Sequence, residues 1–338
     1  MKVCVFGAGA IGGHLAGRLA RGGAVVSAVA RGEHLHAIQA DGLRVQAPDA
    51  DMHARIQASA DPATLGPQDA VIVAVKAPAL PQVAAAIGPL LRPDTAVAFA
   101  MNGIPWWYFH GHGGAQEGQR LPRLDPGGAV WDAVGPDRAV GGLVYSACTV
   151  TAPGVVHVDG RSRLVLGEPC GPALPRTEAL AEALRAGGLQ VDVTDRIRDA
   201  VWAKLLLNLG SGPLAVLTGC APRRFYAEEA ICNATRRVLA EGAAVARAMG
   251  CHAAPDAEGQ IRNGARSSHR SSILQDLDLG RPMEIDALLS VPLDMARAHG
   301  VATPTLDLLA AMVRARAREA GLYPDQPSAP SSGEGPGL

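Results

Sequence analysis

The sequence predicts an α/β protein in which an N-terminal, doubly wound parallel sheet is followed by an all-helical C-terminal domain. Short β-type runs alternate with Ala/Leu-rich helical stretches over the first 100 residues. The runs are apolar throughout, without the alternation of a half-exposed strand, as in a parallel sheet that helices cover on both faces. From Asp195 onward the strand pattern disappears, and helical periodicity of Ala, Leu and Arg replaces it.

The expected elements follow in order along the chain. Four early strands are expected at residues 2–6, 24–30, 70–75 and 95–100, with helices at 11–21 and 80–91. The Gly-rich stretch 111–128 predicts a loop or insertion, after which β character returns at 141–168, a helix at 176–186 and a strand at 189–194. We therefore expect domains at 1–194 and 195–323, and a disordered Pro/Ser/Gly-rich tail at 324–338.

Composition narrows the class of protein. The 338 residues suffice for two cores, and a net charge of −1 provides no basic surface for nucleic acid. No window offers about 18 or more uninterrupted apolar residues, so we expect no membrane span. The six cysteines are scattered without a C-x-x-C pair, which indicates neither a metal site nor a disulfide framework and favours a cytoplasmic protein.

A glycine motif predicts a dinucleotide site. Gly7, Gly9 and Gly12 form G-x-G-x-x-G directly after the first strand and at the start of a helix. In a Rossmann-type βαβ unit, these glycines let the backbone approach a pyrophosphate at the helix N-terminus. The alternative is a tight turn that binds no ligand. The expected cofactor-binding residues here are Gly7, Ala8, Gly9, Ala10, Ile11 and Gly12.

The end of the second strand indicates which cofactor binds. An acidic residue there would accept the ribose 2′-hydroxyl of NAD, whereas arginine accommodates the 2′-phosphate of NADP. Arg31 follows Ala30, and no acid stands at the strand terminus. Arg31 could instead be a solvated surface residue, and Glu33 lies close by. The sequence favours NADP.

Two polar residues follow later strands. Lys76 ends "AVIVAVK", and Asn102 with Gly103 follows "TAVAFA". Open α/β sheets bind ligands at the carboxyl ends of their strands, so both residues are candidates for the cofactor site. A surface lysine and an Asn-Gly turn are the alternatives.

The stretch "VWAKLLLN" places Lys204 and Asn208 one turn apart on a helix that is otherwise apolar. Burying a lysine is unfavourable unless another group pairs with it. This pair therefore indicates a functional site. The alternative is that Lys204 extends from a buried stem to solvent.

Five motifs together resemble one family. "GAGAIGG", "VAVKAPAL", "MNGIP", "WAKLLLN" and "SSILQDLDLGRPMEID" are similar, in order and approximate spacing, to those of ketopantoate reductases (2-dehydropantoate 2-reductases). The resemblance covers nearly the whole chain apart from residues 104–128 and the tail. It implies a Rossmann domain, a helical domain and an active site between them. It also implies NADPH-dependent reduction of a 2-oxo acid, 2-dehydropantoate first, to a 2-hydroxy acid.

The same resemblance assigns roles to individual residues. Lys204 would be the general acid, and Glu284 its acidic partner, close to the cofactor. Lys76 and Asn102 would lie near the cofactor and the reacting centre, while Asn208 and Ser272 would hold substrate. The chemistry is consistent, because hydride delivery to a ketone leaves an alkoxide that needs a proton donor, and burial lowers the pKa of an ammonium. Alternatively, Glu284 could simply favour a helix N-terminus, and Ser271 and Ser272 could be helix caps.

The chain also departs from the family pattern. Gly212 and Pro222 stand where family members carry asparagine, and Met283 stands where they carry threonine. Residues 106–109, "WWYF", would belong to the core or an interface, or would line a pocket for a bulkier substrate.

These departures leave two other functions open: the same chemistry on a bulkier 2-oxo acid, or an NADP-binding sensor without catalysis. The apolar helical faces also make a homodimer plausible.

Overall fold

The strands form one sheet in the computed structural model, which describes residues 1–324. Six of them run parallel in the order β8-β7-β6-β1-β2-β5. Their bounds are Lys2–Phe6 (β1), Val25–Val29 (β2), Gln57–Ser59 (β5), Ala70–Val73 (β6), Ala96–Ala100 (β7) and Ala139–Ala152 (β8). This parallel core confirms the predicted Rossmann-type sheet. Most of the predicted tail, residues 325–338, lies outside the described residues.

A long hairpin extends the sheet. Strand β9 (Val155–Gly167) runs antiparallel to β8, and its two halves pair with β3 (Leu43–Ala47) and β10 (Gln190–Val193). Strand β4 (Ala50–Ala54) completes this end of the sheet beside β3. Only two residues separate β4 from β5, although these strands lie at opposite ends of the strand order. The sheet therefore curls around α1 (Ala10–Arg21), which contacts strands from both halves.

Helices cover the two faces of the sheet. On one face, α1 and α5 (Pro175–Ala186) pack on an apolar core, beside which α2 (Gly32–Asp41) also lies. On the other face, α3 (Leu80–Ala86) and α4 (Ala129–Val134) join a core that continues into the helical part. The predicted helix 80–91 was too long: α3 ends at Ala86, because Gly88 and Pro89 begin a separate 3-10 turn.

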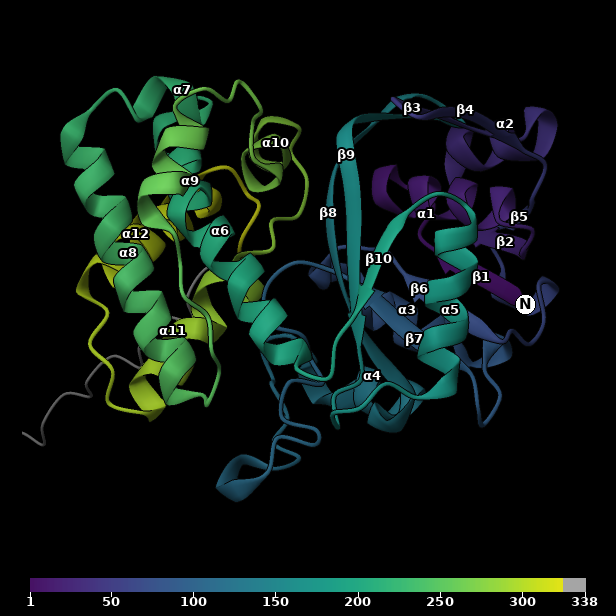
Figure 1. The fold of residues 1–338 in the computed structure, drawn as a ribbon, viewed down its shortest axis with the longest axis horizontal. Helices are drawn as coiled ribbons and strands as arrows, with labels where there is room; N and C mark the ends of the chain where they lie inside the picture. The colour runs from purple at the N-terminus through teal and green to yellow at the C-terminus, as the bar shows by residue number, and fades with distance from the viewer. Residues whose placement is uncertain (325–338) are drawn as a thin grey trace, which may run out of the picture.

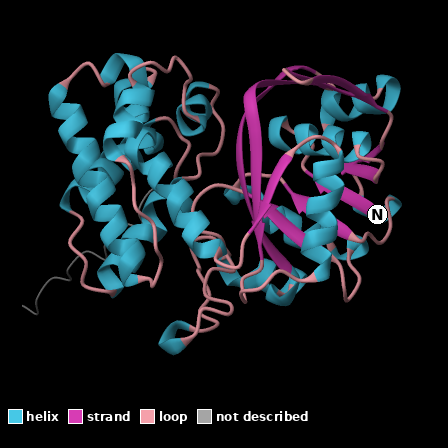
Figure 2. Cartoon of the chain, viewed as in Figure 1, coloured by secondary structure: helices cyan, strands magenta, loops and turns pink. Residues whose placement is uncertain are grey.

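Beyond β10, the described chain is helical (Figures 1 and 2). The elements are α6 (Ile197–Thr218), α7 (Pro222–Phe225), α8 (Glu229–Ala248), α9 (Ala257–Gly264), α10 (Ser272–Asp278), a π-helix (Asp286–Ser290), α11 (Val291–Ala298) and α12 (Pro304–Glu319). Helix α6 packs against α8, α10 and α12 at the centre. Its length and composition would allow a membrane span, but 61% of that window is buried inside the protein. The boundary between residues 194 and 195 stays our proposal for the domain division.

The aromatic residues 106–109 are core. Trp106, Trp107, Tyr108 and Phe109 are each 3% exposed or less, and the Trp106 ring packs edge-on against Phe99. They belong to the core shared by the sheet and the helical part. The predicted insertion follows them and contains only short 3-10 turns, at Gly114–Gln116 and Pro126–Gly128. Its first turn projects from the body of the chain in Figure 1.

Candidate active site

One large cavity lies between the sheet and the helical domain. Its volume is about 1480 Å³. On the sheet side it is lined by the glycine loop, the residues after β2, β6 and β7, and residues 144–150 of β8. On the helical side it is lined by residues of α6, α9 and α10 and by Glu284. The structure thus brings together motifs that are more than 270 residues apart in the sequence.

The glycine loop fits the pyrophosphate of a dinucleotide. Gly7 has a φ of +98°, and a Cβ on Gly12 would collide with the Gly7 carbonyl oxygen, so both positions need glycine. A Cβ on Gly9, in contrast, would meet nothing within 4 Å, which leaves open space at the N-terminus of α1. Residues 7–11 line the cavity, as predicted, whereas Gly12 lies behind the loop and permits close helix–strand packing.

Arg31 also reaches the cavity, at the first turn of α2. Its Nη2 donates to Gln82 Oε1 at 3.1 Å, and both side chains line the cavity. Sequence reasoning missed His34, which also lines the cavity. One ring nitrogen of His34 is 2.7 Å from the Ala8 carbonyl, and the other accepts from the Gly154 amide at 3.0 Å. His34 thus fastens the β8–β9 turn to the glycine loop.

Lys76 forms an ion pair with Asp276 of α10. The Asp276 side chain is 2% exposed, and burial raises the pKa of its carboxyl while the Lys76 ammonium acts to lower it. Lys76 is therefore more than a surface lysine, since it neutralises a buried acid from the other side of the cavity. Sequence analysis passed over Asp276. The signal was present, because it is the acid beside the buried Ile273 and Leu274 on α10.

Glu284 is a second buried carboxylate of the cavity, at 5% exposure. Its Oε2 accepts from Asn102 Nδ2 at 3.2 Å, and its Oε1 accepts from the Ala77 amide at 3.3 Å. Burial raises the pKa of this carboxyl, and the positive charge of Lys76 acts in the opposite direction. The predicted neighbours Lys76, Asn102 and Glu284 thus form one cluster. Glu284 does precede a helix, but its carboxylate binds groups of the other domain.

Gly103 explains why Asn102 can reach Glu284. Its φ is +81°, and a Cβ there would collide with the Ala287 carbonyl. The next residue, Ile104, donates its amide to the same carbonyl oxygen at 2.9 Å. The Asn-Gly pair is therefore a turn, as the alternative had it, and this turn presses against the segment that carries Glu284.

Lys204 faces the cavity from α6, where its Nζ donates to the Val144 carbonyl oxygen at 2.7 Å. The ammonium lies 5.5 Å from the centre of the Tyr145 ring. Burial lowers the pKa of Lys204 from 10.5 to about 8, and the charge of Glu284 partly opposes this effect. Within residues 1–324, no carboxylate lies within 4.0 Å of Nζ. Glu284, the expected acidic partner of Lys204, therefore does not contact the ammonium directly, and a backbone carbonyl holds it instead.

Unpartnered polar groups point to where a ligand would bind. Asn208 Nδ2 and Ser271 Oγ are buried at the cavity without a hydrogen-bond partner. Such groups are unfavourable unless a ligand or water satisfies them. Ser272 also lines the cavity but is exposed. Ser271 occupies the N-cap position of α10 without a side-chain cap bond, so the capping alternative is not supported for it.

Two of the three departures from the family pattern lie at this cavity, whereas Met283 does not line it. Gly212 and Pro222 line it beside Tyr226 and Ile273. A Cβ on Gly212 would meet only Ile273 Cγ2, at 3.4 Å, so there is room beside the backbone. The aromatic residues 106–109 do not line this cavity, but Trp106 and Trp107 line a separate pocket of about 20 Å³ that Asn102 also lines.

A dinucleotide-binding turn that shares one cavity with a half-buried ammonium and a buried carboxylate is typical of a nicotinamide-dependent oxidoreductase. Residues 1–324 contain no cluster of metal-ligating side chains. Two family models match the chain: "Ketopantoate reductase PanE/ApbA" over residues 3–171 and "Ketopantoate reductase PanE/ApbA C terminal" over residues 196–317. The chain belongs to the ketopantoate reductase family.

Individual relatives agree with this assignment. A 2-dehydropantoate 2-reductase of Mesorhizobium japonicum is 44% identical over 96% of this chain and 100% of its own length. A candidate ketopantoate reductase of Ralstonia solanacearum has a TM-score of 0.88 at 39% identity, covering 95% of this chain and 99% of its own. D-mandelate dehydrogenase, solved with NADH and anilino(oxo)acetate, shares the fold: its TM-score is 0.78 at 21% identity, with 96% and 100% covered.

Proposed function

We propose that this chain reduces 2-dehydropantoate (ketopantoate) to pantoate with NADPH. The observation that carries the proposal is the position of the Lys204 ammonium and the unpartnered Asn208 amide on the same cavity as the glycine loop. The 44% identical relative named 2-dehydropantoate 2-reductase supports this choice of substrate.

The residues of the chain account for the proton transfer. When bound, the nicotinamide cofactor supplies a hydride. Lys204 donates a proton from Nζ to the ketone oxygen as negative charge develops there. A pKa of about 8 keeps most of this lysine protonated at neutral pH and makes its proton easier to release than that of a free lysine. Glu284 keeps the ammonium charged through its negative field.

The polar groups around Lys204 would bind the substrate. Asn208 and Ser272 donate hydrogen bonds to it, and the buried hydroxyl of Ser271 offers a further donor. Asn102 and Lys76 line the same cavity and would lie near the reacting centre and the cofactor.

The choice of NADPH over NADH rests on Arg31. Its guanidinium already faces the cavity beside Gln82, and the neighbouring acid Glu33 is exposed outside the cavity lining. A 2′-phosphate would accept charge-assisted hydrogen bonds from this guanidinium. Cytoplasmic location and assembly as a homodimer remain expectations from the sequence.

A second candidate is the same reduction on a bulkier 2-oxo acid. The open space beside Gly212 favours it, because a side chain that would contact the far end of the substrate is missing there. An NADP-binding sensor without catalysis is disfavoured, because Lys204 and Glu284 both stand at the cavity.

The test is consumption of NADPH by the purified protein with 2-dehydropantoate and a panel of branched and aromatic 2-oxo acids. Lys204→Ala is expected to lower kcat by about 10²–10⁴-fold, as for loss of a general acid, with little change in NADPH affinity. Lys2→Ala, at an exposed lysine, is the matched control. Turnover of the panel but not of 2-dehydropantoate would favour the second candidate. Equal activity of Lys204→Ala and wild type would contradict the mechanism.

A further inference from the structure

The segment that carries Glu284 continues directly into a π-helix, Asp286–Ser290. The Leu288 amide donates to the Glu284 carbonyl at 3.1 Å, so the first turn of this segment includes Glu284 itself. π-helical turns are rare and occur often at functional sites. Because only Ile285 separates Glu284 from the π-helix, the placement of that helix decides where the Glu284 carboxylate lies.

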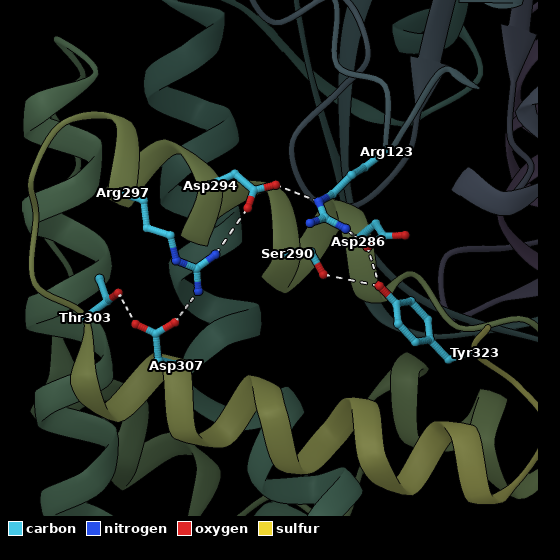
Figure 3. Close-up of polar contacts among 8 residues, drawn as sticks. All are labelled: Arg123, Asp286, Ser290, Asp294, Arg297, Thr303, Asp307 and Tyr323. Carbon is cyan, nitrogen blue, oxygen red and sulfur yellow. Dashed lines mark hydrogen bonds and ion pairs between the residues drawn. The ribbon is translucent and has the colours of Figure 1, made fainter. Parts of the chain in front are cut away.

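Polar side chains that do not line the cavity hold the π-helix (Figure 3). Tyr323 Oη donates to Asp286 Oδ1 at 2.6 Å and lies 3.5 Å from Ser290 Oγ. Arg123 Nη1 lies 3.9 Å from the same Asp286 oxygen, and Arg123 Nε donates to Asp294 Oδ2 at 2.6 Å. Asp286 therefore has one partner from the insertion and one from the residues after α12.

The residues that follow Arg123 are buried and hydrogen-bonded, although the sequence predicted only a loop here. The neighbouring Leu124 is 4% exposed and belongs to the core. Asp125 is 3% exposed, and its carboxylate accepts from the amides of Val130 and Trp131 at 2.8 and 2.9 Å, which caps α4. The backbone on either side of Arg123 is thus held by the core, and Arg123 extends from it to Asp286 of the π-helix.

We propose that Tyr323 and Arg123 are positioning residues that hold the π-helix, through Asp286, so that Glu284 faces the cavity. The proposal rests on the function assigned to Glu284 above. Neither residue lines the cavity, so each acts through Asp286. The insertion, which the family resemblance did not cover, gains a role in this way: it supports the acidic partner of Lys204 from outside the site.

The test compares Tyr323→Phe and Arg123→Ala with Arg297→Ala. Arg297 belongs to the same polar cluster but bonds to Asp294 and Asp307 and not to Asp286. Displacing Glu284 weakens the field that keeps Lys204 protonated. The first two variants should therefore move the basic limb of the kcat–pH profile to lower pH and lower kcat at pH 8 by about 3- to 10-fold. Arg123→Lys should restore part of the loss.

Hydrogen exchange gives a readout that needs no turnover. Peptides that cover residues 284–290 should exchange faster in Tyr323→Phe and Arg123→Ala, while peptides from α8 stay unchanged. If both variants match Arg297→Ala in exchange and in pH profile, the inference is overturned. An inactive wild type would instead refute the proposed function, and the exchange comparison would still decide whether Asp286 is held as described.

Discussion

Replacing Lys204 with methionine should stabilise the fold while it abolishes turnover. A pKa lowered from 10.5 to about 8 means that the fold disfavours the charged form by about 3 kcal/mol, at ~1.4 kcal/mol for each tenfold. Methionine has a similar length and no charge, but it loses the bond to the Val144 carbonyl, worth about 1 kcal/mol. We expect a net gain of about 1–3 kcal/mol in the free energy of unfolding, or about 1–4 °C in Tm for a chain of 338 residues.

The pH dependence of this gain follows from the direction of the pKa shift. The pKa of Lys204 is lower in the fold than in the unfolded chain, so the unfolded chain binds the proton more tightly. The destabilisation is complete below about pH 8 and disappears as the pH rises toward 10.5. The difference in Tm between Lys204→Met and wild type should therefore be large at pH 7 and small at pH 10.

The other two lysines of the chain, Lys2 and Lys76, are matched controls. Lys2 is exposed, and Lys2→Met should change stability by less than about 0.5 kcal/mol. Lys76→Met would leave the buried Asp276 carboxylate without its cation and should destabilise the fold by about 2–4 kcal/mol. Thermal unfolding followed by circular dichroism measures all three variants. A lower Tm for Lys204→Met at pH 7, or the same difference at pH 7 and pH 10, would refute the reasoning.

Three further predictions concern the site. Turnover should fall about tenfold for each pH unit above about 8, as the Lys204 ammonium is lost, and Glu284→Gln should move this limb to lower pH in a kcat–pH profile. A limb that Glu284→Gln leaves in place would contradict the field effect. Arg31→Ala should raise the KM for NADPH by roughly 10- to 100-fold and leave the KM for NADH unchanged; equal effects on both would remove Arg31 from the 2′-phosphate site. Gly103→Ala should lower the free energy of unfolding by about 1–3 kcal/mol, measured in urea, because its φ is positive and its Cβ would meet the Ala287 carbonyl. Wild-type stability in this variant would mean that the turn can move away from the π-helix.

The parallel core of the sheet and the glycine loop could be predicted because their signals are local. Continuous apolar runs and a fixed glycine spacing do not depend on what packs against them. Strands β3 to β5 could not be predicted in the same way. Strands β4 and β5 are joined by only two residues but lie at opposite ends of the strand order. This arrangement depends on how the whole sheet curls, which a local sequence pattern does not show. No element was predicted for residues 32–69, so helix α2 was missed together with these strands.

The contacts of the site were harder to predict than its members. Lys76, Asn102, Lys204, Asn208 and Glu284 all reach the cavity, as their positions in the motifs suggested. Lys204 donates to the backbone carbonyl of Val144 in β8. Every residue has such a carbonyl, so the sequence cannot show which one accepts the bond. The partner of Lys76 is Asp276. The sequence does not pair these two residues, because the contact depends on how α10 packs against the segment after β6.

Hydrogen bonds connect the aromatic segment 106–109 to the helix that carries Lys204. Trp202 is fully buried on α6, and its Nε1 donates to Tyr108 Oη at 2.8 Å. Arg198, one turn earlier, donates to the carbonyls of Tyr108 and His110. These bonds fix the first turns of α6 against the sheet domain, two residues before Lys204. The start of the helix that carries Lys204 is therefore anchored to the core of the sheet domain.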